Sequence, residues 1–374
     1  MSKRARLLVP ALALGLGLSA CGKKAEPQKP VPTAEPTKPA EPTKPPEPTK
    51  PPEPTTAAEA DAGAAPEPTK PPEPTTAAEA DAGAAPAPEA PKPVFDTAGF
   101  STPESVLVVP KAEYYVVSNI NGAPLDKDDN GFLSKLGPDG VVLEPKWIDG
   151  AREDVELHAP KGMAISGATL YVADIDTVRA FDLATGRPTG AVPVGGATFL
   201  NDVYAMDEGG WVYVTDSAIG PDFKPKGTPG VLRFREQKGD QAPTLMALED
   251  VGLPNGVFVM PAADGDTVAI NGFDDAKVVR VWRSGEAKPT TLAVPAGQLD
   301  GLEMRVTTDA DGKPKTLWYT SSWETGSVYE LDDHGGSRVI VSGLKGPADF
   351  TIDDERGVVI VPVFLDNRVV AYTL

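Results

Sequence analysis

The chain has 374 residues, of which 41 are proline and 24 are aromatic (11 Phe, 8 Tyr and 5 Trp), and neither group is evenly spread. No aromatic residue precedes Phe95, whereas 21 of the prolines lie between residues 22 and 93. A folded core needs large apolar side chains, so the first quarter of the chain is not a conventional domain. Residues 1–21 carry +3 and residues 22–93 carry −4, which leaves −18 of the net charge of −19 for residues 94–374. A domain this acidic repels phosphate backbones, which disfavours nucleic-acid binding and favours divalent cations or neutral and cationic ligands.

The first 21 residues resemble the export signal of a bacterial lipoprotein. Three basic residues precede an apolar run, Leu7 to Leu18, that is too short to span a bilayer. The run ends in the sequence LSAC, in which Cys21 would become the acylated first residue of the mature chain. Because Cys21 is the only cysteine, an intrachain disulfide and a thiolate metal cluster are excluded. We therefore expect a signal peptide at 1–20 and a lipid anchor at Cys21. The protein would then lie at the bacterial cell envelope, on the periplasmic or outer-membrane face. An ordinary export signal is the alternative.

Residues 21–93 have the composition of a spacer. The twenty residues from Glu47 to Pro66 recur without change from Glu67 to Pro86. Repeated PPEPT blocks favour extended polyproline II, and the alanine-rich stretches between them are softer. The sequence thus predicts a disordered Pro/Glu/Thr/Ala-rich linker that separates the next domain from the membrane. A proline-rich docking motif is the alternative interpretation.

From Val94 onward, short strands of β-branched and aromatic residues are broken by Gly, Asp, Asn and Pro. One three-strand unit recurs six times, with starts 40 to 57 residues apart, at residues 104, 161, 201, 255, 300 and 348. Such repeats are typical of a six-bladed β-propeller, with a β-sandwich as the alternative. The last unit ends after its third strand, so we expect residues 94–100 to supply the fourth and to close the ring. The prediction is one all-β domain over residues 94–374, monomeric as a propeller.

One position recurs at the head of each unit, two residues before its first apolar anchor. In chain order it holds Glu104, Lys161, Asn201, Asn255, Asp300 and Ala348. Because the first strand of each blade lines the central channel, these residues should face one another around one mouth of it. Four of the six offer a carboxylate or amide oxygen, which suits a hard divalent cation such as Ca²⁺. The pattern predicts a metal site; a merely polar channel lining is the alternative.

The elements PES, FLND, LPNG and LDG, at the heads of units one, three, four and five, resemble the senescence marker protein/gluconolactonase/luciferin-regenerating enzyme family, and more distantly the paraoxonases. The resemblance covers essentially all of residues 95–374. It implies metal-dependent hydrolysis of lactones or phosphotriesters, with Ca²⁺ first and Zn²⁺, Mn²⁺ or Mg²⁺ as alternatives. It further implies that Glu104, Asn255 and Asp300 are metal ligands, and that Asn201 is a ligand or a substrate contact. Asp300 would also be the carboxylate that assists a water.

Lys161 departs from that pattern, because paraoxonase-like members place a catalytic histidine at the corresponding position. An ammonium group there would compete with the metal or bind an anionic group of the substrate. The two histidines, His158 and His334, are expected to be surface residues, although His158 could still reach the rim. Phosphotriester hydrolysis is therefore disfavoured, and lactone hydrolysis remains open with Asn201 and Lys161 as substrate contacts.

An acidic segment begins like a calcium-binding EF-hand loop at Asp126, Asp128 and Asn130. Its twelfth position is Gly137, where that loop needs a bidentate glutamate. We therefore expect an acidic hairpin turn. The chain also lacks the GxSxG and GxxxxGK[ST] motifs, which leaves a serine hydrolase or a P-loop NTPase unsupported.

Polar residues end several second strands near the same mouth. Asp174, Asp216 and Asn271 either support the metal ligands from behind or simply terminate their strands. Trp323, just after a second strand, either walls a pocket or packs in the core.

Two functions follow from these observations. The first is a metal-dependent hydrolase of lactone-like esters, acting on a small-molecule substrate. The second is a non-catalytic propeller, related to NHL-repeat domains, that binds a sugar, a peptide or an envelope protein. Fold alone does not decide between them.

Overall fold

The computed structural model describes residues 92–206, 210–236, 242–261, 265–309 and 311–374. The predicted signal peptide, Cys21 and the linker up to residue 91 lie outside these residues. Within the described ranges, no helix is long and apolar enough to cross a membrane.

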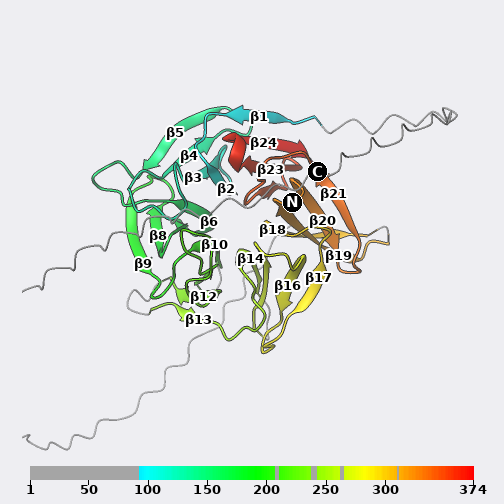
Figure 1. The fold of residues 1–374 in the computed structure, drawn as a ribbon. Helices are drawn as coiled ribbons and strands as arrows, with labels where there is room; N and C mark the ends of the chain where they lie inside the picture. The colour runs from blue at the N-terminus through cyan, green and yellow to red at the C-terminus, as the bar shows by residue number, and fades with distance from the viewer. Residues whose placement is uncertain (1–91, 207–209, 237–241, 262–264, 310) are drawn as a thin grey trace, which may run out of the picture. The chain divides into compact units, whose positions relative to one another are not determined.

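Six four-stranded antiparallel sheets follow one another around a central axis, and five of them are formed by consecutive segments of the chain (Figure 1). The predicted six-bladed β-propeller is therefore confirmed. Blade one consists of β2 (Pro103–Val108), β3 (Tyr115–Asn119), β4 (Phe132–Leu136) and β5 (Val142–Asp149). Blade two consists of β6 (Pro160–Ser166), β7 (Thr169–Asp174), β8 (Thr177–Asp182) and β9 (Pro188–Pro193). Blade three consists of β10 (Leu200–Ala205), β11 (Trp211–Asp216), β12 (Gly230–Arg235) and β13 (Thr244–Leu245).

Blade four consists of β14 (Pro254–Met260), β15 (Thr267–Gly272), β16 (Val278–Trp282) and β17 (Thr290–Ala293). Blade five consists of β18 (Leu299–Thr308), β19 (Pro314–Ser322), β20 (Ser327–Asp332) and β21 (Ser337–Val341). Blade six combines β22 (Thr351–Asp353), β23 (Val358–Val363) and β24 (Arg368–Thr373) with β1 (Phe95–Ala98) from the other end of the domain. The one helical element in the described ranges is the 3₁₀ turn η1 (Phe364–Asp366).

Closure of the ring by β1 is as predicted. β1 pairs antiparallel with β24, from Phe95 opposite Ala371 to Ala98 opposite Arg368. The Arg368 guanidinium also bonds to the Asp96 carboxylate. β1 covers the edge of β24 and becomes the outer strand of blade six, so it joins the two ends of the domain in one sheet.

The described residues form seven clusters of buried apolar side chains, six of which lie one between each pair of neighbouring blades. Second strands lie in the middle of their sheets and are covered on both faces, as the fully buried β23 illustrates. This explains why they are continuous apolar runs such as VVIVPV, whereas an outer strand such as β9 is mostly exposed. The clusters fix the first strands around the axis.

Candidate metal centre

The position at the head of each unit coincides with a break in strand pairing. In blade four, Pro254 pairs with Gly272 and Val257 pairs with Ile270, so Asn255 and Gly256 together oppose a single residue. The first strands of blades one, two, three and five show the same irregularity. A β-bulge of this kind leaves a residue unpaired and redirects its side chain. Five residues thus occupy one equivalent bulge position: Glu104, Lys161, Asn201, Asn255 and Asp300.

The glycine that follows this position allows neighbouring blades to approach closely. A Cβ on Gly256 would lie 2.6 Å from the Asp300 carbonyl oxygen, and one on Gly301 would lie 2.8 Å from the Phe350 nitrogen. Real Cβ atoms do not come so close to backbone, so the glycines of PNG and LDG are required by packing between blades. The ring of first strands is therefore tight at this height.

Four predicted ligands are buried and have a side-chain oxygen without a hydrogen-bond partner. We call them the oxygen ring: Glu104, Asn201, Asn255 and Asp300. Their relative exposures are 5, 6, 3 and 4%. Each has one buried side-chain oxygen without a hydrogen-bond partner, namely Glu104 Oε2, Asn201 Oδ1, Asn255 Oδ1 and Asp300 Oδ1. Leaving a buried acceptor unsatisfied costs about 1–3 kcal/mol, and a bound cation would remove that cost. The donor set, two carboxylates and two amides, suits a hard divalent ion.

Electrostatics at the ring also favours a cation. Burial raises the pKa of Glu104 well above its usual value, and the nearby Asp300 and Asp349 raise it further. Burial and the Asp349 carboxylate likewise raise the pKa of Asp300, against the Trp323 hydrogen bond, which lowers it. The charged form of each carboxylate is thus destabilised, that of Glu104 even though the nearby Lys161 lowers its pKa.

Lys161 lies at the blade-two position, and its ammonium group is bonded to backbone. Nζ donates to the carbonyl oxygens of Pro124, at 3.0 Å, and Ala159, at 3.1 Å, and lies 4.7 Å from the centre of the Phe199 ring. Burial lowers the pKa of Lys161 to about 8, while Glu104 and Asp174 act in the opposite direction. With 1% exposure, this ammonium belongs to the wall of the site.

Asn271 supports the ring from behind. Its Oδ1 accepts the Gly256 N–H at 2.8 Å, and its Nδ2 donates to the Gly301 carbonyl at 2.8 Å and to Thr320 Oγ1 at 2.9 Å. It therefore fixes the residues that follow Asn255 and Asp300 in two neighbouring blades.

Equivalent polar residues elsewhere were missed by sequence reasoning. Ser118, Thr215 and Ser321 accept the N–H of the residue after Glu104, Asn201 and Asp300, respectively. The sequence did contain a pattern that could have identified them, because each is the last residue but one of the second strand of its blade.

Asp174 and Asp216 hold the loops that lead into the ring. Asp174 accepts the backbone N–H groups of His158 and Ala159, just before Lys161. Asp216 accepts the N–H of Phe199 at 2.9 Å, just before Asn201. These two residues cap strand ends and act on the ring through the backbone.

Trp323 contacts a ring residue directly. Its indole N–H donates to Asp300 Oδ2 at 2.8 Å, so that Oδ1 is the carboxylate oxygen without a partner. The indole also packs against Phe273, with 5.5 Å between ring centroids, and against Phe364, with 5.2 Å. Trp323 thus joins the oxygen ring to an aromatic surface.

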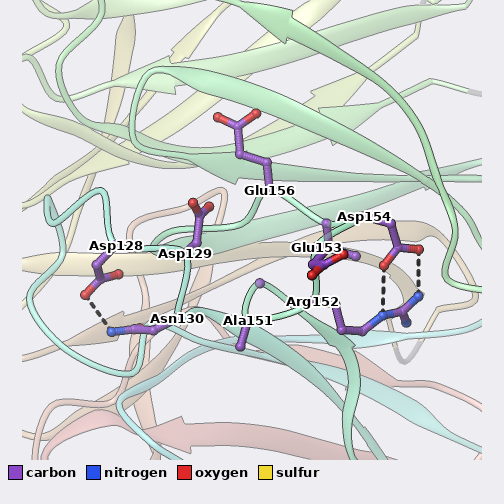
Figure 2. A pocket seen from close by; sticks show the side chains of 10 residues that line it. Asp128, Asp129, Asn130, Ala151, Arg152, Glu153, Asp154 and Glu156 are labelled. Carbon is purple, nitrogen blue, oxygen red and sulfur yellow. Dashed lines mark hydrogen bonds and ion pairs between the residues drawn. The ribbon is translucent and has the colours of Figure 1, made fainter.

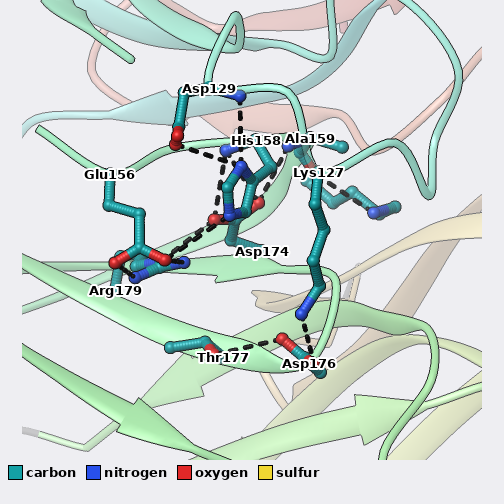
Figure 3. Close-up of polar contacts among 10 residues, drawn as sticks. Lys127, Asp129, Glu156, His158, Ala159, Asp174, Asp176, Thr177 and Arg179 are labelled. Atoms are coloured by element: carbon teal, nitrogen blue, oxygen red, sulfur yellow. Dashed lines mark hydrogen bonds and ion pairs between the residues drawn. The ribbon is translucent and has the colours of Figure 1, made fainter. Parts of the chain in front are cut away.

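His158 is buried, contrary to the expectation of a surface residue (Figure 3). Its Nδ1 accepts the Asp129 N–H at 3.1 Å, and Nε2 lies 3.5 Å from Glu156 Oε1. Arg179 donates to both Asp174 and Glu156, which completes a structural network at the rim. His334 is exposed as expected, with 87% of its side chain accessible.

A cavity of about 640 Å³ lies between two loops, which we call the acidic loops: residues 128–130 and 150–156 (Figure 2). No oxygen-ring residue lines it. Asn130 Nδ2 donates to Asp128, and Arg152 pairs with Asp154. Within the described ranges, no three His, Cys, Asp or Glu side chains are arranged to hold a metal. The EF-hand-like segment lies in the loop between β3 and β4, and its assignment as an acidic turn stays a prediction. The oxygen ring draws half of its oxygens from amides, so it does not contain three such side chains either.

Sequence reasoning also missed three carboxylates inside the channel. A cavity of about 220 Å³ is lined by first-strand residues of blades one to five and by the two residues before the first strand of blade six, and its lining includes Asp202, Glu303 and Asp349. Burial and then Asp349 raise the pKa of Glu303 to about 8, and burial raises that of Asp349 to about 7. Asp202 accepts the N–H groups of Val203 and Val257, and Asp349 accepts the Ser105 hydroxyl. These acids are bonded to the protein itself.

Comparison with known proteins gives a likeness of fold. No protein-family model matches the chain, and no curated protein matches it. A gluconolactonase from Xanthomonas campestris is similar over 75% of this chain and 88% of its own, with 17% identity and a TM-score of 0.51. A candidate gluconolactonase from a structural-genomics programme is similar over 77% of this chain and 93% of its own, with 15% identity and a TM-score of 0.52. The chain has the propeller fold of gluconolactonases. The resemblance suggested by the four sequence elements is confirmed at that level.

Proposed function

We propose that the propeller is a divalent-metal-dependent hydrolase of lactone or similar ester substrates, held at the cell envelope through lipidated Cys21. The observation that carries the proposal is the oxygen ring, with four buried oxygens that lack protein partners. Ca²⁺ is the preferred ion. All four donors are hard oxygen atoms, and Ca²⁺ sites combine carboxylate oxygens with neutral amide oxygens, as this ring does. The gluconolactonase-like fold supports the substrate class.

A bound ion would polarise the carbonyl group of the substrate. Glu104 and Asp300 would supply the compensating charge, Asn255 would complete the ligand set, and Asn201 would bind the ion or the substrate. Asp300 has two proposed roles, ligand and base, but one unpartnered oxygen, Oδ1. Asp300 could bind the ion through Oδ1 and accept a proton at the lone pair of Oδ2 that the Trp323 hydrogen bond leaves free. Lys161 would bind an anionic substrate group if Nζ exchanged its hydrogen bond to the Pro124 or the Ala159 carbonyl for one to that group.

One observation favours the second function, a non-catalytic binding module. The ring residues are only 3–6% exposed, which also suits an ion that holds the blades together without turnover. The rim would then bind a sugar, a peptide or an envelope protein, as NHL-like propellers do.

Elemental analysis of the purified full-length chain tests the site before any substrate is known. We expect about one divalent ion per chain, lost in Glu104→Gln and Asp300→Asn and kept in the matched control Asp128→Asn. A lactone panel with added Ca²⁺, Zn²⁺ or Mn²⁺ then tests catalysis, and Asp300→Ala should abolish turnover. Bound metal without turnover would favour the binding module, and a metal-free protein would reduce the ring to channel lining.

A further inference from the structure

In each blade, the residue that follows the second strand lies at an equivalent position beside the oxygen ring. In five blades its backbone N–H donates to the carbonyl of the residue two before the ring position, at 2.9–3.1 Å. These donors are Ile120, Ser217, Phe273, Trp323 and Phe364. Ile175 follows β7 at the same place in blade two. Six side chains therefore surround the mouth at one height.

Five of these six side chains are apolar, and we call them the apolar collar: Ile120, Ile175, Phe273, Trp323 and Phe364. The two isoleucines are buried, and Phe364 packs against them. The three aromatic residues come from consecutive blades, touch one another in sequence and remain partly exposed. A partly exposed aromatic arc can contact a ligand, whereas fully buried rings would only fill the core.

Trp323 places this arc next to the reacting centre of the proposed hydrolase. Its one polar atom, Nε1, is bonded to Asp300 Oδ2. The rest of the indole is hydrocarbon, and it lies beside the carboxylate whose Oδ1 has no partner. A substrate group held near Asp300 would therefore meet an apolar face.

Two polar side chains beside the collar, Ser217 and Lys161, are already bonded to backbone. The Ser217 hydroxyl, at the sixth place, donates to the Pro254 carbonyl at 2.6 Å. Lys161 Nζ donates to two backbone carbonyls. These bonds occupy the Ser217 hydroxyl proton and two of the three Lys161 donors, so substrate hydroxyls would find few free donors there, whereas an apolar group needs none.

We infer that the substrate of this site is a lactone or ester bearing an aromatic or alkyl group, which packs on Phe273, Trp323 and Phe364. Polyhydroxylated sugar lactones would bind poorly. The inference rests on the proposed hydrolase function for the identity of the reacting group, and on the collar for the rest of the substrate.

Hydrolysis-resistant lactams test the inference by binding alone. The probes are 3,4-dihydroquinolin-2-one, δ-valerolactam and gluconolactam, titrated by calorimetry into the Ca²⁺-loaded full-length chain. We expect the aromatic lactam to bind at least tenfold more tightly than gluconolactam, and alkyl substituents to add roughly fourfold per buried CH₂. Phe273→Leu and Phe364→Leu should each reduce the aromatic preference about fivefold without loss of metal. Val306→Ala, 65% exposed on β18, should leave it unchanged.

Equal or tighter binding of gluconolactam, unchanged preference in both collar variants, or no binding of any lactam would overturn the inference. Turnover of the corresponding lactones separates this result from the proposed function. An aromatic preference in binding without any turnover would contradict the hydrolase and leave the collar assignment standing. Metal-dependent turnover that favours the sugar lactone would do the reverse.

Discussion

The oxygen ring and the acidic loops both concentrate oxygen atoms, yet they differ in how those atoms are satisfied. In the ring, four side chains are 3–6% exposed and each has an oxygen without a partner. In the acidic loops, the side chains of Asp129, Asp154 and Glu156 are 51, 59 and 64% exposed, and water can solvate them. One amide oxygen of these loops, Asn130 Oδ1, is also buried without a partner, but none of their carboxylates shares that property. The comparison teaches that density of negative charge does not mark a cation site. A set of buried acceptors without partners, carboxylates among them, is the better mark, because such a set gains strongly from an ion.

The two regions also differ in what holds them. Asn271 links two blades behind the ring through three buried hydrogen bonds. In the acidic loops, His158 and Arg179 hold Asp129 and Glu156, and the other side-chain contacts are local, such as Asn130 Nδ2 on Asp128. A ring built this way keeps its oxygens in position before any ion arrives, which lowers the cost of binding.

The largest expected effect comes from breaking this support. Asn271→Ala leaves the Gly256 N–H and the Gly301 carbonyl buried without partners, and we expect a loss of about 3–5 kcal/mol in the free energy of unfolding. Urea denaturation at neutral pH measures it. Asn130→Ala is the matched control in the acidic loops and should cost less than about 1 kcal/mol. Similar losses in both variants would remove the proposed difference between the two regions.

The fold was predictable because each blade repeats a β-branched second strand, and the register of the ring followed from the triplets PES, PNG and LDG. Three features were beyond reach. Alternation places consecutive residues on opposite faces, so Asp202, next to Asn201, was not expected to line the channel. The β-bulge changes that direction. The burial of His158 and the approach of Gly256 to Asp300 depend on contacts between blades, which a single strand pattern does not encode.

A smaller effect should appear with pH. Burial raises the folded-state pKa of Asp349 to about 7 and of Glu303 to about 8, and raises those of Glu104 and Asp300 as well. These groups keep protons when folded that they lose when unfolded. The stability of the metal-free chain is therefore greatest at low pH within this window and falls as pH rises from about 5 to about 8.

Thermal melting with chelator between pH 5 and pH 8 measures this change. A difference of one pKa unit between the folded and unfolded states changes the free energy of unfolding by about 1.4 kcal/mol. For a domain of this size, a loss of that amount lowers the melting temperature by roughly 3–6 °C, and we expect a fall at least this large. Added Ca²⁺ should restore part of the loss at pH 8, because a bound cation favours the charged forms of Glu104 and Asp300. A melting temperature that rises with pH, or that Ca²⁺ leaves unchanged, contradicts the assignment of raised pKa values to the channel and the ring.

The smallest effect is expected where charge is densest. Asp128→Asn and Glu153→Gln remove carboxylates from the acidic loops without creating buried unpaired groups, so each should change the free energy of unfolding by no more than about 0.5 kcal/mol. Metal affinity, measured by calorimetry with Ca²⁺, should stay within about twofold. The loss of long-range attraction from an exposed charge is largely screened at physiological salt. If either variant instead reduces Ca²⁺ binding as far as Asp300→Asn does, the acidic loops hold the ion, and the unpartnered oxygens of the ring require another explanation.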